Sequence, residues 1–349
     1  MTSRRRSRNA LTIYDVAQHA GVSPMTVSRV INGETGVRET TRATVTASIE
    51  ALNFSPNLAA RSLAGADVIR IALLYSNPSA AYLSEFLVGC LEQSSQAGCQ
   101  LVIEKCDGPQ SERAAIRKLV TAGANGVILP PPLCDSQVAL AALTAGDTPA
   151  IGVATGRPPS GLSVVRIDDF AASRVMTRRL LALGHRDIAL IKGHPNQIAS
   201  LERERGYRTA MDEADIPVSE DRVLAGYFTF KSGFDAAERL LDAPPRPSAI
   251  FACNDDMAAG AIAVAHRQGL DVPRDLSVVG FDDTALASTV WPTLTTIRQP
   301  IADMARTAVT LLIDQIRARR DGKRLEPVHR LLQFTLVERE STAKYRTSD

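Results

Sequence analysis

The sequence of 349 residues is long enough for two or three domains, and its 45% apolar and 22% charged content is that of an ordinary globular protein, not a disordered or fibrous one. No apolar run is long enough to cross a bilayer, and the arginine-rich N-terminus lacks the apolar segment of a secretory signal, so a cytoplasmic protein is expected. Five cysteines without C-x-x-C spacing predict reduced thiols instead of a disulfide framework.

The charge is unevenly distributed along the chain. Residues 1–62 hold eight arginines and four acidic residues, a net charge of +4, so the rest of a chain whose net charge is +2 has a net charge of −2. A basic head on a mildly acidic body favours an anionic partner for the head alone. Residues 1–10 are predicted to form a basic, disordered arm that lies near phosphates when the head is bound; a merely solvated tail is the alternative.

Residues 11–55 are predicted to form a head of three helices. Thr12 and Asp15 make a capping box that starts the first helix, and Gly21 ends it because glycine tolerates a left-handed backbone. Ser23 is a suitable N-cap for a second helix. Two short helices joined by a turn of three or four residues are typical of helix-turn-helix domains.

The second helix is predicted to have two unlike faces. Val27, Val30 and Ile31 fall on one side, whereas Met25 and Arg29 fall on the opposite side. Two hydroxyl side chains flank that opposite side, Thr26 and Ser28. Such a helix fits a DNA major groove, where arginine pairs with guanine and methionine contacts a thymine methyl group. The alternative is that this face only meets solvent.

A third helix completes the predicted head, and a short helix follows it. Residues 39–52 show an apolar side at helical spacing, and Arg38 and Arg42 lie at the start of that helix, where free amide groups favour a phosphate. Residues 56–66 begin with a proline, and residues 57–63 within them form one or two turns, too short to be stable in water without a partner. They are interpreted as a hinge helix, with a plain linker as the alternative.

From about residue 67, short apolar runs such as "IRIALLY" and "AIFACND" alternate with amphipathic segments. This alternation is typical of parallel sheets covered by helices, and it runs twice, to about residue 165 and from about 170 to 290. The predicted class is therefore α/β, with two doubly wound parallel-sheet lobes. Ligands of such sheets bind beyond the carboxyl ends of the strands, so the two lobes should form a cleft.

Amides, carboxylates, an arginine and aromatic rings follow the predicted strands. The candidates are Asn77, Tyr82, Asp168, Gln197, Arg203, Phe228, Asn254, Asp255 and Asp282. Such groups share hydrogen bonds with vicinal hydroxyls, and aromatic faces cover the C–H surface of a sugar, which favours a carbohydrate ligand. The alternative for each Asp after a strand is a helix N-cap.

Two other function classes share some of these features. A transport-type binding protein has the two-lobed body, but the basic head and the missing secretory signal speak against it. An enzyme is disfavoured because common nucleotide-binding and hydrolase motifs are absent, although Asp282 and Asp283 form a possible catalytic pair. The five histidines lack metal-ligand spacing, and His185 and His194 are interpreted as surface or turn residues. No cofactor is expected.

Several motifs together resemble the lactose-repressor (LacI/GalR) family of bacterial transcription regulators over about residues 11–341. They are "TIYDVAQHAGVSPMTVSRVING", "LNFSPNLAARSLAG", the R-x-x-G-aromatic pattern at 203–207, "NDxMA" at 254–258 and "GxDD" at 280–283. The resemblance implies a homodimer that binds a palindromic operator in double-stranded DNA, with no membrane role. It also implies a repressor of carbohydrate-use genes under the allosteric control of a small sugar-like effector.

The resemblance also implies roles for individual residues. In the head, Pro24, Met25 and Arg29 fall on base-reading positions, and the positions that hold the DNA backbone or the motif itself are occupied by Tyr14, Ser23, Thr26, Ser28 and Asn32. The hinge helix implies DNA contacts for Asn57, Ala60 and Leu63, with Leu63 as a minor-groove wedge. In the body, Arg203, Asn254 and Asp282 would contact effector and Phe228 would stack on it, whereas Gln197 and Tyr82 are weaker assignments.

The family's two lobes exchange segments near the C-terminus. By resemblance, lobe 1 takes about residues 67–165 and 295–325, and lobe 2 takes about 166–294 and 326–341, which leaves 342–349 as a tail. Because that tail shows no apolar heptads, a dimer is expected and a tetramer is not.

Overall fold

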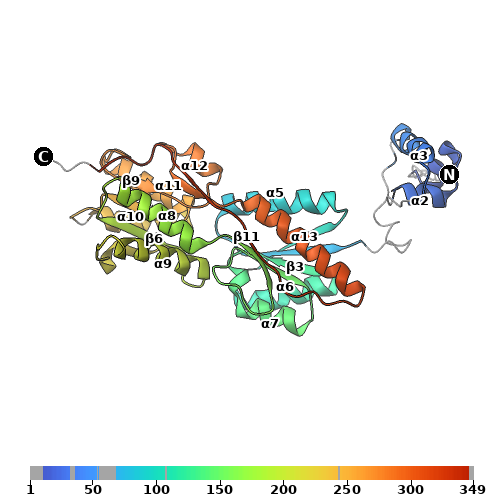
Figure 1. The fold of residues 1–349 in the computed structure, drawn as a ribbon, viewed down its shortest axis with the longest axis horizontal. Helices are drawn as coiled ribbons and strands as arrows, with labels where there is room; N and C mark the ends of the chain where they lie inside the picture. Colours follow the sequence, from blue (N-terminus) through green and yellow to red (C-terminus); the bar gives the residue numbers. More distant parts are fainter. Residues whose placement is uncertain are drawn as a thin grey trace, which may run out of the picture. The chain divides into compact units, whose positions relative to one another are not determined.

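The computed structural model describes residues 11–31, 36–52, 54, 68–106, 108–242 and 244–345. The chain divides into two compact units, a head (residues 1–68) and a body (residues 69–349) (Figure 1). The predicted basic arm at 1–10 and the hinge helix at 56–66 lie outside the described residues.

The head contains the three predicted helices, α1 (Ile13–Ala20), α2 (Pro24–Ile31) and α3 (Glu39–Ala51). The Thr12 amide donates to Asp15 Oδ2 over 2.6 Å, which makes the capping box of α1. Gly21 has a φ of 66°, as its role at the end of α1 requires. The amide of Thr26 donates to Ser23 Oγ over 3.1 Å, which confirms the N-cap of α2. The three helices share a small core with three fully buried valines, Val16, Val27 and Val45.

Lobe 1 of the body is built on a six-stranded parallel sheet with the order β11-β5-β4-β3-β1-β2. The strands are β1 (Arg70–Tyr75), β2 (Gln100–Lys105), β3 (Gly126–Leu129), β4 (Ala150–Val153), β5 (Ser163–Arg166) and β11 (His329–Leu331). Helices α5 (Ala80–Gln96) and α13 (Ile301–Arg320) pack together on one face, and α6 (Pro109–Thr121) and α7 (Gln137–Ala145) pack on the other (Figure 1). A short helix, η1 (Leu133–Asp135), precedes α7.

Lobe 2 is built on a four-stranded parallel sheet with the order β7-β6-β8-β9. The strands are β6 (Ile188–Lys192), β7 (Val223–Ala225), β8 (Ala249–Ala252) and β9 (Ser277–Val279). Its helices are α8 (Asp169–Ala182), α9 (Ile198–Asp212), η2 (Glu220–Arg222), α10 (Phe230–Asp242), α11 (Asp255–Arg267) and α12 (Ala285–Thr289). Helices α8 and α9 pack together, as do α10 and α11. Two helix-covered parallel sheets confirm the predicted α/β class.

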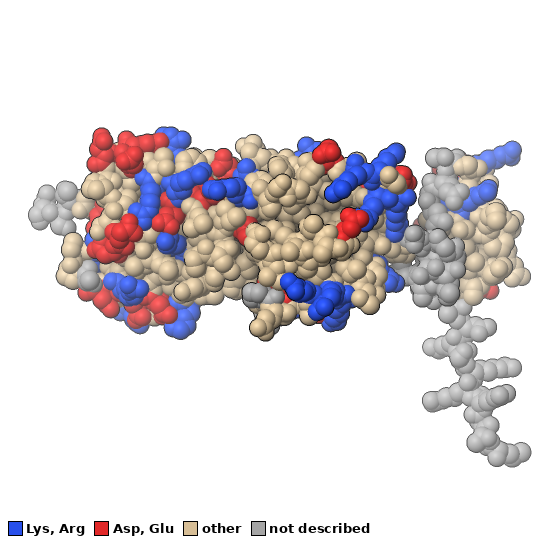
Figure 2. Space-filling model, turned by 90° about the horizontal axis from the view of Figure 1, so that it is seen from below, with Lys and Arg blue, Asp and Glu red and all other residues tan. Residues whose placement is uncertain are grey.

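The surface of the body is uneven in charge. Figure 2 shows Lys and Arg side chains gathered over one end of lobe 1, whereas the two signs are mixed over lobe 2. Among the helices within the described ranges, none combines the length and apolar character needed to cross a bilayer.

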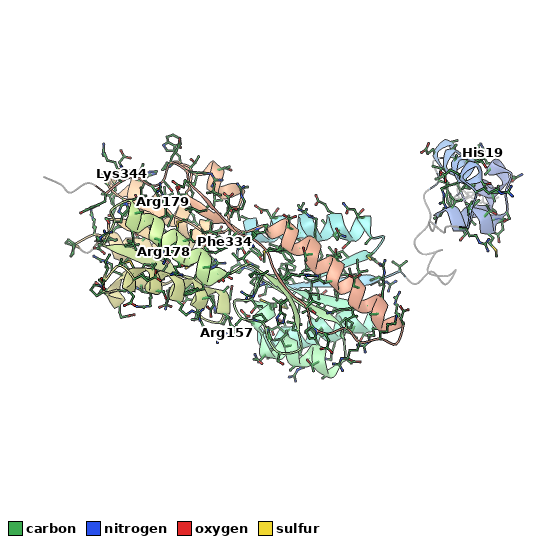
Figure 3. All side chains as sticks on the ribbon, viewed as in Figure 1. His19, Arg157, Arg178, Arg179, Phe334 and Lys344 are labelled. Atoms are coloured by element: carbon green, nitrogen blue, oxygen red, sulfur yellow. The ribbon has the colours of Figure 1, made fainter. Side chains whose placement is uncertain are left out.

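Three chain segments cross between the lobes. The first links β5 to α8, the second links β10 (Thr296–Arg298) to α13, and the third links β11 to β12 (Thr335–Val337). The third contains Phe334, which Figure 3 labels between the two lobes. The Leu332 amide donates to the Arg166 carbonyl over 2.8 Å, so the first and third crossings lie side by side.

The crossing points differ from the expected lobe boundaries at residues 295 and 326. Strand β10 pairs antiparallel with β12 and packs on α8, so it stays with lobe 2 until the chain enters α13. Strand β11 pairs parallel with β5 and therefore belongs to lobe 1. Strands of three residues show no periodicity of their own, and distant hydrogen-bond partners decide which sheet they join.

Residues 341–345, near the C-terminus, are held against lobe 2 by hydrogen bonds. The amide of Tyr345 donates to the Leu183 carbonyl over 2.8 Å, and His185 Nε2 lies 3.1 Å from the Ala343 carbonyl oxygen. The interpretation of His185 as a surface or turn residue was wrong, because its side chain is buried beneath residues 341–345. Burial lowers the pKa of His185, and the hydrogen bond to Ala343 opposes that shift.

The close packing of α5 on α13 generates the first prediction. A Cβ atom at Gly89 would lie 2.3 Å from the Ala302 carbonyl oxygen, a backbone atom that cannot turn aside. We expect Gly89→Ala to lower the free energy of unfolding by about 1–3 kcal/mol in urea denaturation, although alanine favours helix. The matched control is Gly146→Ala at the end of α7, where the closest atom is the Thr148 hydroxyl at 3.2 Å. Equal unfolding midpoints for the two variants would contradict the packing.

Candidate functional site

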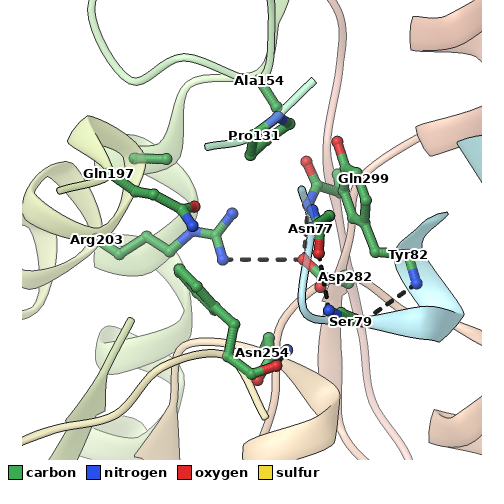
Figure 4. A pocket seen from close by; sticks show the side chains of 12 residues that line it. Asn77, Ser79, Tyr82, Pro131, Ala154, Gln197, Arg203, Asn254, Asp282 and Gln299 are labelled. Carbon is green, nitrogen blue, oxygen red and sulfur yellow. Dashed lines mark hydrogen bonds and ion pairs between the residues drawn. The ribbon is translucent and has the colours of Figure 1, made fainter. Parts of the chain in front are cut away.

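A pocket between the two lobes gathers most of the residues proposed for the effector. Asn77, Tyr82, Gln197, Arg203, Phe228, Asn254 and Asp282 all line it (Figure 4). The cavity encloses about 30 Å³, room for one or two water molecules. Small-molecule pockets are typically about 300–1,000 Å³. A sugar therefore enters only if the lobes separate or the lining side chains move.

Arg203, from α9, is the buried cation of this pocket, with only 5% of its surface exposed. Its Nε donates to Asp169 Oδ1 over 2.8 Å, and its Nη1 donates to the Cys253 carbonyl at the end of β8. The guanidinium carbon lies 3.6 Å from the centre of the Phe281 ring. Burial opposes the charge of Arg203, but Asp169 and Asp282 outweigh it and raise the pKa of the guanidinium.

Asp282 faces Arg203 from the loop after β9. Asp282 Oδ1 lies 3.8 Å from Arg203 Nη1 and accepts a hydrogen bond of 2.6 Å from Gln299 Nε2. Burial raises the pKa of Asp282 well above its usual range, while Arg203 opposes the shift. The Asp282 backbone has a φ of 111°, a conformation that side chains other than glycine rarely adopt. Strain of this kind is tolerated where a function needs the side chain in place.

Phe228 presents the pocket's aromatic ring and also has a left-handed backbone, with a φ of 59°. Its ring rests on Gly193, where an added Cβ would lie only 1.8 Å from the ring. The Asn254 amide nitrogen donates to the Phe228 carbonyl over 3.1 Å, and Asn254 Oδ1 caps α11 by accepting from the Met257 amide. Asn254 therefore fixes Phe228 and α11 as well as lining the pocket.

Asp168 and Asp255 do not line the cavity. Asp168 Oδ1 accepts from the Ala171 amide over 2.9 Å, which is the N-cap alternative that the sequence left open. Asp255 is buried and accepts hydrogen bonds from the Thr284 amide and the hydroxyls of Thr284 and Thr296. Burial raises the pKa of Asp255 to about 7, and these donors oppose the shift. Both residues hold elements of lobe 2 in place.

The pocket also contains residues that were not among the candidates. They are Ser79, Pro131, Ala154, Ala199 and Gln299. Gln299 lies on the second crossing segment, and a glutamine after a three-residue strand carries no local signal of a site. Two buried polar atoms on lining residues, Tyr82 Oη and Gln299 Oε1, have no hydrogen-bond partner within the described structure. Unsatisfied buried groups of this kind are suited to a polar ligand.

Polar contacts also join the two lobes across the cleft. Ser79 Oγ donates to Asp256 Oδ2 over 2.6 Å, from the start of α5 to the start of α11. The Ile198 amide at the start of α9 donates to Asp135 Oδ2 over 2.9 Å. These contacts hold the lobes together in the present conformation.

The head presents the predicted face of α2 to solvent. Met25 is 66% exposed and Arg29 is also exposed, whereas Val27 and Val30 are buried. Tyr14 is 70% exposed on α1. The remaining described candidates lie at the surface or partly buried, namely Ser23, Pro24, Thr26, Ser28, Arg38 and Arg42. Asn32, Asn57, Ala60 and Leu63 lie outside the described residues.

No metal centre is built into the parts of the chain that the structure describes. In those ranges, His, Cys, Asp and Glu side chains nowhere form a group of three or more suited to a metal ion.

Two family models match the chain. Residues 12–57 match the bacterial regulatory proteins of the lacI family, and residues 177–342 match a periplasmic binding protein-like domain. The first match includes all three helices of the head, and the second includes most of lobe 2 and helix α13.

Relatives match over nearly the whole chain. The HTH-type transcriptional regulator DegA of Bacillus subtilis (strain 168) is 35% identical over 343 residues, which cover 96% of this chain and 99% of DegA. The HTH-type transcriptional repressor PurR of Photorhabdus laumondii is 34% identical over 332 residues, which cover 95% of this chain and 96% of PurR. The likeness therefore includes both head and body.

Solved structures show the same likeness. A complex of the transcriptional regulator CelR with cellobiose superposes with a TM-score of 0.72 at 32% identity, over 95% of this chain and 99% of CelR. The lac repressor dimer bound to operator and the anti-inducer ONPF superposes with a TM-score of 0.76 at 30% identity, over 96% of this chain and 100% of that one.

The different positions of Asp168 and Asp169 generate the second prediction. We expect Asp168→Ala to remove a helix cap and lower the free energy of unfolding by about 0.5–2 kcal/mol. Asp169→Ala should cost about 3–5 kcal/mol, because it leaves the buried Arg203 without its closest carboxylate. Urea denaturation of the two variants measures both values. A larger loss from Asp168→Ala than from Asp169→Ala would contradict the assigned roles.

Proposed function

The chain belongs to the lacI family of bacterial regulatory proteins, and from that we propose that it represses carbohydrate-use genes under the control of a sugar-like effector bound in the cleft. It is a DNA-binding transcription regulator with a ligand-binding domain. The observation that supports the finer proposal most directly is the pocket, in which hydrogen-bonding side chains lie beside the rings of Tyr82 and Phe228.

The proposed DNA-reading surface is the exposed face of α2. Met25 and Arg29 lie on the side of the helix opposite the core that Val27 and Val30 share with the other helices, so this side is the one that suits a major groove. One head supplies few base contacts, and a symmetric operator calls for two heads, so we propose that the working form is a homodimer. A regulator of bacterial genes acts in the cytoplasm, where the DNA lies.

A polyhydroxylated effector fits the chemistry of the pocket. Tyr82 Oη offers a donor and Gln299 Oε1 an acceptor, and neither has a partner within the described structure. Asn77 and Gln197 add amides, and the Phe228 ring suits the C–H face of a sugar. The same ring suits a planar nucleobase, so purines form the competing class of ligand in a thermal-shift screen against mono- and disaccharides.

We propose binding without turnover as the chemistry of the cleft. The two carboxylates considered as a catalytic pair are both engaged in ion pairs, Asp282 with Arg203 and Asp283 with Arg298 and Arg339. An acid–base pair needs one carboxyl group free to exchange protons with the substrate. Release of product from any sugar incubated with the purified protein would contradict this part of the proposal.

Control of DNA binding requires that the effector prefers one arrangement of the lobes. Because the present cavity admits only water-sized molecules, an effector stabilises a form in which contacts such as that of Ser79 with Asp256 have changed. Coupling of this kind is typically about 1–3 kcal/mol between two sites.

The third prediction separates base reading from phosphate binding in the head. We expect Arg29→Ala to weaken binding to an operator, selected from random duplexes, by about 1–3 kcal/mol and to change non-specific binding little. Arg42→Ala, at the start of α3, should weaken both kinds of binding alike. Gel-shift titrations with selected and scrambled duplexes measure the two effects. If Arg29→Ala and Arg42→Ala behave identically, the assigned roles fail.

The fourth prediction tests the role of the Tyr82 hydroxyl in the pocket. Tyr82→Phe removes a buried hydroxyl that has no partner in the described structure, so the folded protein should keep its stability. The variant's affinity for the effector identified in the thermal-shift screen should fall about tenfold, because one hydrogen bond to the ligand is lost. Isothermal titration calorimetry measures this affinity. DNA binding in the absence of effector should stay the same. Unchanged effector affinity would exclude Tyr82 from the site.

A further inference from the structure

Basic side chains gather at one edge of lobe 1. This group, named here the basic edge, consists of Arg70, Arg317, Arg319, Arg320, Lys323 and Arg324. Arg70 begins β1, and its amide donates to Asn125 Oδ1, just before β3, over 2.8 Å. Arg319 pairs with Asp147, just before β4. Because β1, β3 and β4 are parallel, the basic edge lies at their amino ends, whereas the effector pocket lies beyond the carboxyl ends.

The charge of the basic edge contrasts with that of the body. Asp147 pairs with Arg319 and Asp321 is the C-cap of α13, so the six cations and these two carboxylates together have a net charge of +4. Residues 69–349, the body, hold 32 basic and 33 acidic residues, a net charge of −1. The rest of the body therefore has a net charge of −5. A local excess of this sign is the electrostatic footprint of an anionic partner.

Helix stability alone does not account for this group. Basic residues in the last turn of a helix interact favourably with its dipole, which explains Arg317, Arg319 and Arg320 at the end of α13. Lys323 and Arg324 lie beyond that end on an exposed loop. Within the described residues, no carboxylate forms an ion pair with Arg317, Lys323 or Arg324. Neither the helix dipole nor an ion pair in that part of the chain therefore explains the two loop cations.

The surface beside these cations is hollowed. A groove of about 390 Å³ is lined by Asn125, Asp147, Thr148, Arg319 and Arg320, among others. Asp147 pairs with Arg319 there, and the guanidinium groups, the amide and the hydroxyl are groups that donate to phosphate oxygens. In Figure 2, many of the Lys and Arg side chains that are visible on lobe 1 lie toward one end of that lobe.

We infer that the basic edge binds backbone phosphates of the same DNA that the head recognises. This inference rests on the DNA-binding function and adds a second contact surface, on the body. The chain enters the body just before Arg70, on the basic edge itself, and residues 55–69 connect Arg70 to Phe54 of the head. These 15 residues reach at most about 54 Å. DNA held by the head is thereby kept at a high local concentration near the basic edge, which favours DNA over a free acidic protein.

The test compares two full-length variants that differ from the natural protein by the same change in charge. Arg317→Gln, Lys323→Gln and Arg324→Gln together remove three positive charges from the basic edge. The control removes three exposed charges from lobe 2 through Lys231→Gln, Arg267→Gln and Arg274→Gln. The affinity of each protein for a fluorescein-labelled 40-base-pair duplex of random sequence is measured by anisotropy between 50 and 200 mM salt.

We expect the basic-edge variant to flatten the plot of log affinity against log salt by about 0.9 for each phosphate that the protein no longer neutralises, up to about 2.7 per chain. The control should stay within about twofold of the natural protein at every salt concentration. As a second variant, Arg324→Glu alone reverses one exposed charge with little effect on folding and should flatten the plot by about 0.9.

Equal losses of affinity in the basic-edge and control variants would show that only net charge matters, and unchanged slopes in both would show that the body does not touch DNA. Either result overturns the inference and leaves the head's function intact. If the natural protein fails to bind the duplex even at 50 mM salt, DNA binding by the chain fails as well.

Discussion

The buried charge of Arg203 is the constraint around which the cleft is organised. A guanidinium with 5% exposure is stable only when carboxylates and carbonyls surround it, and here they come from three places in lobe 2. Asp169 begins α8, Cys253 follows β8 and Asp282 follows β9. Neutralising one cation therefore fixes three elements relative to α9, and through Gln299 it also fixes the second crossing segment. The shape of the pocket follows from that network.

Local chemistry made much of the fold predictable, and distant partners decided the rest. Helix caps such as Ser23 and Gly21 depend on contacts within four residues, and the apolar strands can be predicted from their composition. Which of Asp168 and Asp169 faces Arg203 was not predictable from the sequence. A step of one residue turns a helical side chain by about 100°, and only packing selects the carboxylate that faces the arginine. Gln299 was missed because its site depends on β10 pairing with β12, almost forty residues away.

The pocket also shows how one set of residues serves both structure and binding. Asn254 caps α11 and holds the carbonyl of Phe228, and Ser79 caps α5 while it bridges to Asp256 in the other lobe. A ligand that replaces such bonds changes the relation of the lobes at the same time as it binds. Recognition and conformational response are in this way parts of a single equilibrium.

Helix α13 starts two residues after Gln299 and ends at the basic edge. Its 20 residues make a straight rod of about 30 Å. Gly89 lets this rod lie directly on α5, so it has little room to bend. If the lobes reorient so that the rod pivots by about 10° at the cleft, its far tip travels about 5 Å. A small rearrangement at the effector pocket would then become a larger displacement at the basic edge, with α13 as the lever.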